Sequence, residues 1–130
     1  MTGNERRQGD LMGELESGKT IQILIDEPAW IKRKKFEIPA TYINFFPADS
    51  LGARGKADKE KWPERGKPVE LDYGFVKSIK DIATWKSGKM RPRDNGVMRN
   101  FLEANKFALG DIVCITRTDE RSYKVSLIKR

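Results

Sequence analysis

The sequence predicts an α+β protein made mainly of antiparallel β-strands that curl into a small barrel, with two short helices. Three observations predict this fold class. The chain has 130 residues, which suits one domain. Segments that alternate apolar and polar residues, or that are rich in β-branched residues, follow one another across short turns, as strands of hairpins do. Two further segments have the apolar spacing of helices.

In the first half of the chain, residues 20–25 are rich in β-branched side chains and predict a strand, which Asp-Glu-Pro at 26–28 would end. Residues 36–38 alternate apolar and polar and predict a second strand. Pro39 suits the first position of a helix whose apolar face would run to residue 46. The charged stretch 48–67 predicts a long connection with Trp62 as an anchor.

The second half predicts further strands over residues 69–73, 75–79, 82–85, 112–115 and 123–128. Residues 86–93 combine turn residues with cations. A second helix is expected from Asn95 to Asn105, because apolar side chains recur there at helical spacing. The order of these elements favours a sheet built from hairpins.

Residues 1–19 are polar and contain several glycines, which predicts a flexible N-terminal segment and a single domain over 20–130. One cysteine and no histidine exclude an internal disulfide framework and the common zinc sites. The usual general base and the triads built on histidine are missing too. We therefore expect no catalytic residue, metal or cofactor, and Cys114 should be an inert core thiol. No apolar run approaches the ~18 residues of a membrane span.

The chain carries 26 Lys and Arg against 19 Asp and Glu, a formal net charge of +7. This balance favours a polyanionic partner, usually nucleic acid. Residues 32–35 are four consecutive bases, residues 77–99 hold seven bases against two acids, and residues 53–68 have a net charge of +3. Trp30 stands beside the first cluster and Trp85 within the second. Solvated basic loops are the competing interpretation.

The C-terminal third resembles a known family. Residues 105–111 read Asn-Lys-Phe-Ala-Leu-Gly-Asp after the second helix, and a closing strand ends in basic residues. Gly110 allows a turn that other residues disfavour, and Asp111 can anchor that turn. Together with Phe-Glu-Ile-Pro at 36–39 and the aromatic segment 42–47, this order resembles the B3 DNA-binding domain.

The resemblance implies a seven-stranded open pseudobarrel with two short helices that binds double-stranded DNA sequence-specifically in the major groove. The family uses two arms for this contact, which fall here on residues 26–36 and about 83–94. Such domains occur in plant transcription factors and as recognition or effector domains of restriction endonucleases. Residues 97–101 lack the tryptophan of the plant pattern, and the connection 48–67 is atypical. Both departures favour the restriction-enzyme branch.

The expected DNA-binding residues are those of the two arms: Trp30, Lys32, Arg33, Lys34, Lys35, Trp85, Lys86, Ser87, Lys89, Arg91, Arg93, Asp94 and Asn95. Arg33, Arg91 and Arg93 are expected to read bases, because a guanidinium spans O6 and N7 of guanine. The lysines are expected to bind phosphates. Asp94 and Asn95 are candidates for cytosine and adenine edges, and Asn95 also suits a helix cap.

The other arm residues have two interpretations each. An extended first arm would alternate its four bases, so that two face the duplex and two face away. Trp30 and Trp85 would either pack on sugars or support their arms. Ser87, next to a glycine, would let the backbone approach a phosphate.

Other functions remain open. A small β-barrel that binds single-stranded nucleic acid, a transcription-factor DNA-binding domain and a module that docks an acidic protein are the alternatives. For the leading hypothesis we expect double-stranded DNA as partner, no membrane, a nuclease domain in cis and a monomer in isolation. The expected location is on DNA in a bacterial cytoplasm, or in the nucleus of a eukaryote.

Overall fold

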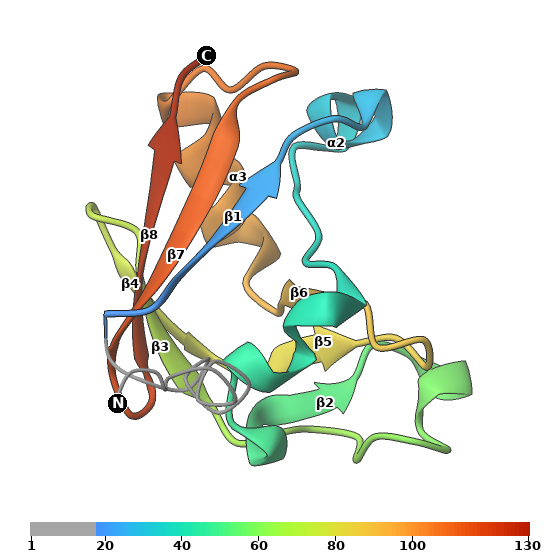
Figure 1. The fold of residues 1–130 in the computed structure, drawn as a ribbon. Helices are drawn as coiled ribbons and strands as arrows, with labels where there is room; N and C mark the ends of the chain where they lie inside the picture. The colour runs from blue at the N-terminus through green and yellow to red at the C-terminus, as the bar shows by residue number, and fades with distance from the viewer. Residues whose placement is uncertain (1–17) are drawn as a thin grey trace, which may run out of the picture.

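The computed structural model describes residues 18–130, which contain eight β-strands, two α-helices and three short 3₁₀ helices (Figure 1). The strands are β1 (Thr20–Leu24), β2 (Leu51–Ala53), β3 (Val69–Asp72), β4 (Lys77–Lys80), β5 (Ile82–Thr84), β6 (Met90–Pro92), β7 (Ile112–Asp119) and β8 (Ser122–Ile128). The α-helices are α2 (Pro28–Arg33) and α3 (Asn95–Ala104), and the 3₁₀ helices cover Ala40–Phe45, Ala48–Ser50 and Lys56–Asp58.

The predicted flexible segment 1–19 falls mostly on residues 1–17, which lie outside the described residues. Gly18 and Lys19 are held by the backbone of Arg117 in β7. The Gly18 N–H donates to the Arg117 carbonyl, and the Arg117 N–H donates to the Lys19 carbonyl at 2.8 Å. Both residues therefore pair with β7 just before β1 begins.

The larger sheet has the strand order β1-β7-β8-β3-β4. Its centre is the β7–β8 hairpin, in which Ile112 lies opposite Ile128. β1 pairs antiparallel with β7, whereas β3 runs parallel to β8 and antiparallel to β4. The alternation of the strand predicted over residues 69–73 is confirmed in β3, where Val69 and Leu71 are buried and Glu70 and Asp72 are half-buried.

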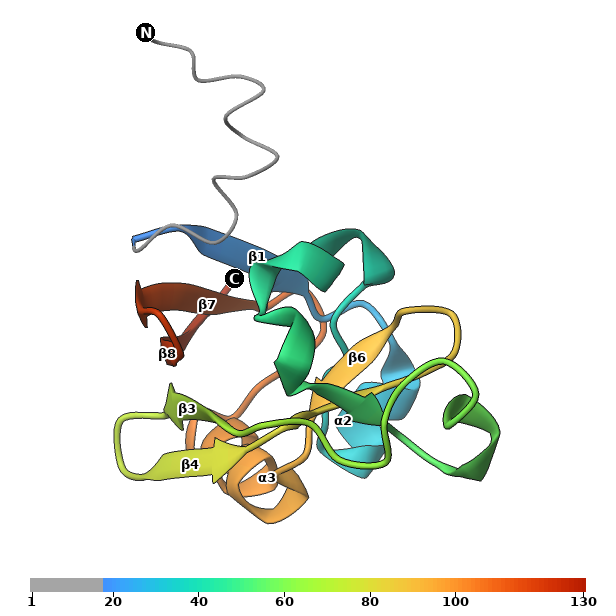
Figure 2. The same ribbon diagram turned by 90° about the horizontal axis from the view of Figure 1, so that it is seen from below.

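The smaller sheet has the order β2-β5-β6, with β2 parallel to β5 and a β5–β6 hairpin. The strand expected over residues 36–38 is reduced to a bridge in which Ile38 and Met90 exchange two backbone hydrogen bonds, of 2.8 and 2.9 Å. Figures 1 and 2 show the smaller sheet beside the larger one, without closure into a barrel. The fold is thus α+β, with two mixed sheets and eight strands rather than seven.

Both sheets cover one hydrophobic core. Phe45, Phe46 and Tyr123 meet there with ring centroids 5.1–5.4 Å apart, and the Tyr123 hydroxyl donates to the Phe45 carbonyl at 3.1 Å. Strands β1, β2, β5, β6 and β7 and helix α3 add further buried apolar side chains. Cys114 is buried, and burial raises the pKa of its thiol, as expected of an inert core residue.

Two predictions for the first half need correction. The helix expected after Pro39 is a 3₁₀ helix over Ala40–Phe45, bounded by a second proline at 47. The connection 48–67 contains β2 and two 3₁₀ turns. A Cβ at Gly52 of β2 would meet the carboxylate of Asp81, so this close approach requires glycine.

The helix, the turn and the two strands predicted for the C-terminal third are confirmed. Helix α3 spans Asn95–Ala104, and the Asn105 amide donates to the Phe101 carbonyl at 2.8 Å to end it. Gly110 has φ = +96°, and the buried Asp111 accepts the Ala108 N–H at 2.8 Å. No helix among residues 18–130 is long and apolar enough to cross a membrane.

Candidate nucleic-acid interface

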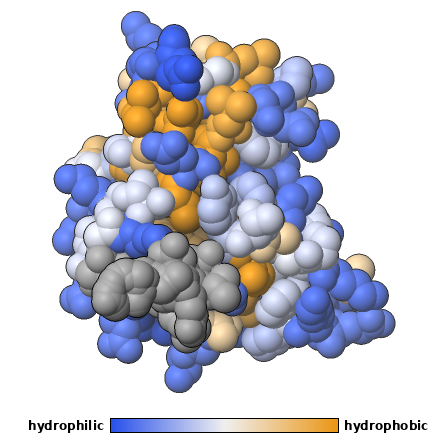
Figure 3. Space-filling view, viewed as in Figure 1, coloured by the Kyte–Doolittle hydropathy of each residue, from blue (hydrophilic) through white to orange (hydrophobic). Residues whose placement is uncertain are grey.

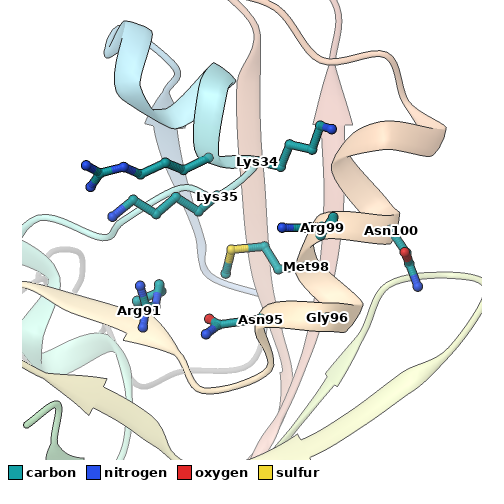
Figure 4. A pocket seen from close by; sticks show the side chains of 9 residues that line it. Lys34, Lys35, Arg91, Asn95, Gly96, Met98, Arg99 and Asn100 are labelled. Carbon is teal, nitrogen blue, oxygen red and sulfur yellow. The ribbon is translucent and has the colours of Figure 1, made fainter.

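An open hollow of about 590 Å³ lies between α2, β6 and α3 (Figure 4). In Figure 1, α2 lies at the upper right, α3 to its left and β6 below them. The hollow is lined by Arg33, Lys34, Lys35, Arg91, Asn95, Gly96, Met98, Arg99 and Asn100. Five of these nine residues are cationic and none is acidic. We call this site the first basic hollow. Both predicted arms contribute to it.

The first arm is a helix rather than an extended loop. Pro28 occupies the first turn of α2, where its fixed φ and missing N–H are tolerated. Lys34 ends the helix in the left-handed conformation (φ 54°, ψ 59°), and the Lys35 N–H donates to the Trp30 carbonyl at 3.1 Å. The alternation expected of an extended arm is therefore wrong. Arg33, Lys34 and Lys35 lie at the C-terminal end of α2, and all three line the hollow.

Helix α2 contains no buried residue, and three contacts hold it. Trp30 and Ile31 are half-buried and pack against the core. The Lys34 ammonium lies 2.9 Å from the Glu103 carboxylate, and this hydrogen bond lowers the pKa of Glu103. In Figure 4 the Lys34 side chain points toward α3, in agreement with this pair. The first arm is thus attached through its side chains.

Glu37 joins the two arms. Its carboxylate lies 2.7 Å from the Lys35 ammonium and 3.1 Å from the Lys89 ammonium. Burial alone would raise the pKa of Glu37, but the hydrogen bonds and charges of the two lysines outweigh burial and hold the pKa below its ordinary value. Glu37 therefore links Lys35 of the first arm to Lys89 of the second arm.

Arg91 projects from β6 into the first basic hollow (Figure 4). Its Nε is buried without a hydrogen-bond partner among the described residues. Burial lowers the pKa of Arg91, and the nearby Arg54 and Arg93 lower it further, against the opposing charges of Glu37 and Asp94. The guanidinium stays charged at neutral pH. It is therefore a poorly neutralised cation with an unused donor.

The Trp85 ring lies against three cations. The side-chain charges of Lys89, Arg54 and Arg91 lie 4.8, 5.0 and 5.8 Å from its centroid. Distances in this range are attractive for a cation over an aromatic face. The Trp62 indole N–H donates to the Trp85 carbonyl at 2.8 Å, which confirms Trp62 as an anchor. Trp85 does not line the first basic hollow. Its ring instead contacts Lys89 and Arg91 of the second arm.

Arg93 is engaged inside the protein. Its Nε and Nη2 donate to the two oxygens of Asp81 at 2.6 and 3.0 Å, and Nη2 also donates to the Ala53 carbonyl at 2.8 Å. The fork that a guanine would need is already occupied by a carboxylate. We therefore correct the expectation for Arg93 and remove it from the residues proposed to read bases.

Asp94 is also turned inward, which corrects its expected role at a base edge. It is 6% exposed, and its Oδ2 accepts the hydroxyls of Tyr73 at 2.9 Å and Ser78 at 2.6 Å. Burial raises the pKa of Asp94, although these hydrogen bonds oppose the shift. Asp94 holds the N-cap position of α3 without a side-chain cap, so the cap expected at Asn95 is wrong too. Asn95 is exposed in the first turn and lines the hollow.

The remaining predicted residues do not line the hollow. Lys32 is exposed on α2, and Trp30 packs inward. Lys86 lies 2.8 Å from the exposed carboxylate of Glu60. Ser87 is exposed in the β5–β6 turn, where its hydroxyl accepts the Lys89 N–H at 3.4 Å.

Of the α3 residues that line the hollow, sequence reasoning predicted Asn95 and missed Gly96, Met98, Arg99 and Asn100. Asn95, Gly96, Arg99 and Asn100 are spaced i, i+1, i+4 and i+5, so one face of the helix carries all four. The helical period was visible in the sequence, together with the exposed position of Arg99. What was not visible is that this face lies opposite α2.

No protein-family model matches the chain, and no curated protein matches it. Among solved structures, a hypothetical protein of Arabidopsis thaliana matches with a TM-score of 0.49 and 17% identity. The match covers 88% of this chain and 95% of the other. This likeness is distant, and we infer nothing about function from it.

Proposed function

We propose that this protein binds double-stranded DNA sequence-specifically in the major groove, through the first basic hollow and the two arms beside it. The observation that carries this proposal is the convergence of residues 33–35, Arg91 and Arg99 on one concave surface without an acidic residue. A basic concave surface attracts a polyanion, and two arms at its edges suit a groove. The two-sheet fold is compatible with the seven-stranded open pseudobarrel of B3 domains, which we propose as its family.

The arginines and lysines have different roles in this proposal. Arg33 and Arg91 read bases, because their guanidinium groups have no carboxylate partner among the described residues and present a two-donor fork. Lys34 and Lys35 bind phosphates as point charges, after exchanging Glu103 and Glu37 for the DNA backbone. Arg99 joins the phosphate contacts from α3.

The proposed setting is a restriction endonuclease in which this chain is the non-catalytic recognition or effector domain. Cleavage would then take place in a nuclease domain in cis, and the protein would act on DNA in a bacterial cytoplasm. Plasmid incubated with the isolated chain and Mg²⁺ is expected to stay intact. Mg²⁺-dependent nicking by the purified wild-type chain would overturn this part of the proposal.

Single-stranded nucleic acid is a weaker candidate ligand. Proteins that bind single strands stack bases on exposed aromatic side chains. Phe75 is the exposed aromatic side chain of residues 18–130, and it lies in the β3–β4 turn rather than in the hollow. The other aromatic side chains of this part are buried or half-buried. Duplex DNA therefore fits the surface better.

The test is selection of bound sequences from a randomised duplex pool, followed by binding of the enriched duplex over a range of salt concentrations. We expect one short sequence to be enriched and log K to fall with log salt at a slope near −0.9 per phosphate contact. Single strands of the same sequence should not displace the duplex. Equal displacement would favour the single-strand alternative, and no enrichment would favour an acidic protein partner.

A further inference from the structure

A second basic hollow, of about 170 Å³, lies on a segment that the proposed function does not use. It is lined by Ala53, Arg54, Gly55, Lys56, Lys59, Glu64, Arg65 and Arg93. Five of these eight residues are cationic, and Glu64 is the one acid among them. We call this site the second basic hollow. In Figure 3 the surface where Figure 1 draws Lys56–Asp58, at the lower right, is strongly hydrophilic.

The segment 54–65 is held firmly, although its composition is that of a solvated loop. Asp58 is 3% exposed, and its carboxylate accepts the Lys86 N–H at 2.7 Å and the Gly55 N–H at 3.0 Å. Trp62 adds the hydrogen bond to Trp85 described above. The segment is therefore attached to the second arm at two points, and its cations are presented in a defined arrangement.

Several of these cations lack a neutralising partner. Lys56 and Arg65 are exposed and form no ion pair among the described residues. Arg54 lies 3.3 Å from Asp58 but also near Arg91, whose pKa it lowers. Like charges held this close repel one another, and an anionic ligand would relieve the repulsion.

One cation from each basic hollow lies against the same tryptophan ring. Arg91 lines the first hollow and Arg54 lines the second, and both approach the ring of Trp85, at 5.8 and 5.0 Å. A strand of phosphates that leaves the first hollow past Arg91 would meet Arg54 next. This proximity of Arg91 and Arg54 favours one long polyanion over two separate small anions.

We propose that the segment 54–65 is a third DNA-contacting element, which binds phosphates of the duplex that flanks the sequence read by the two arms. This inference rests on the proposed function. Lys56 and Arg65 make these contacts, and Arg54 orients the segment through Asp58 and Trp85. The contacts are to phosphates, so they add affinity without sequence preference.

The test is the double variant Lys56→Gln/Arg65→Gln, in which two exposed positive charges are lost without loss of a described hydrogen bond. Fluorescence anisotropy is measured over a salt series with two duplexes. The short duplex contains the enriched sequence alone, and the long one extends it by about one helical turn on each side. The matched control is Lys106→Gln/Lys124→Gln, which removes two exposed charges that line neither hollow.

For the long duplex, the double variant should lower affinity and make the slope of log K against log salt less negative by about 1.8, from two lost contacts. The short duplex and the base preference should be unchanged, and the control should bind as the wild type does. Wild-type behaviour of the double variant on the long duplex, or an equal loss in the control, would overturn the inference while leaving the proposed function intact. A wild-type protein that binds neither duplex would overturn both.

Discussion

The two arms have similar residues and different surroundings. In the first arm, α2 has no buried residue, and Lys32 and Arg33 form no ion pair among residues 18–130. In the second arm most cations pair with a carboxylate: Lys86 with the exposed Glu60, Lys89 with Glu37 and Arg93 with Asp81. A cluster of tryptophan and basic residues in the sequence therefore does not by itself predict a ligand-binding site. Nearby carboxylates decide which of its cations are free to bind a ligand.

The largest expected effect separates structural from ligand-binding arginines. Arg93→Ala leaves the buried Asp81 carboxylate without its bidentate partner, so we expect the free energy of unfolding to fall by about 3 kcal/mol. Urea unfolding measures this change. Lys86→Ala, which removes an exposed pair, is the control and should change stability by less than about 0.5 kcal/mol. An Arg93→Ala protein of wild-type stability that has lost its base preference would restore Arg93 as a base reader.

The next effect concerns the free arginine of the same arm. Arg91→Ala should reduce discrimination between the enriched duplex and a duplex changed at one base pair by roughly 1–3 kcal/mol, because the fork to guanine is lost. Competition binding measures the ratio. Arg91→Lys keeps the charge and should lose discrimination while retaining most non-specific affinity. Equal losses on matched and scrambled duplexes would make Arg91 a phosphate contact instead.

A smaller effect tests the bridge between the arms. Glu37→Gln should lower stability at pH 7 by about 1 kcal/mol, because two ion pairs to half-exposed lysines are lost. The folded-state pKa of Glu37 lies below its ordinary value of 4.5, so the ionised carboxylate stabilises the fold above pH 4.5, and this contribution is lost as the pH falls through the lower folded value. Thermal unfolding from pH 7 to pH 3 should show the two proteins converging. A difference that is constant over this range would contradict the bridge.

The smallest effect concerns the first arm. Lys34→Ala removes an exposed pair with Glu103, so stability should change by less than about 0.5 kcal/mol. Affinity should fall about equally for matched and scrambled duplexes, and the salt slope should become less negative by about 0.9. A salt titration with both duplexes checks this. Loss confined to the matched duplex would show that Lys34 reads a base.

Local patterns predicted the elements that depend on neighbouring residues. Strands β1, β3, β7 and β8 and helix α3 were recognisable because their apolar periods run within one segment. Helix α2 was missed although Pro28 after two acids is a start signal for a helix, because the basic run that follows was interpreted as a loop. Strand β2 has little signal of its own, since its parallel partner β5 is distant in the sequence.

Only part of the candidate site was predicted, because some of its residues have partners that are distant in the sequence. Both basic clusters were located from charge alone, and Arg33, Lys34, Lys35, Arg91 and Asn95 do line one hollow. Arg93 is excluded as a base reader by its hydrogen bonds to Asp81, and Asp94 by its hydrogen bonds from Tyr73 and Ser78. These partners are far enough along the chain that no local pattern connects them.

By itself, the sequence determined the fold class, most strands of the larger sheet, the α3 helix with its Gly110–Asp111 turn, and the positions of the basic clusters. These features follow from periodicity and turn chemistry, which act over a few residues. The tertiary structure alone decided which cations stay unpaired, how α3 faces α2, and that Arg91 of the first basic hollow and Arg54 of the second both approach the ring of Trp85. Charges act through space, and only the folded chain sets which charges are close.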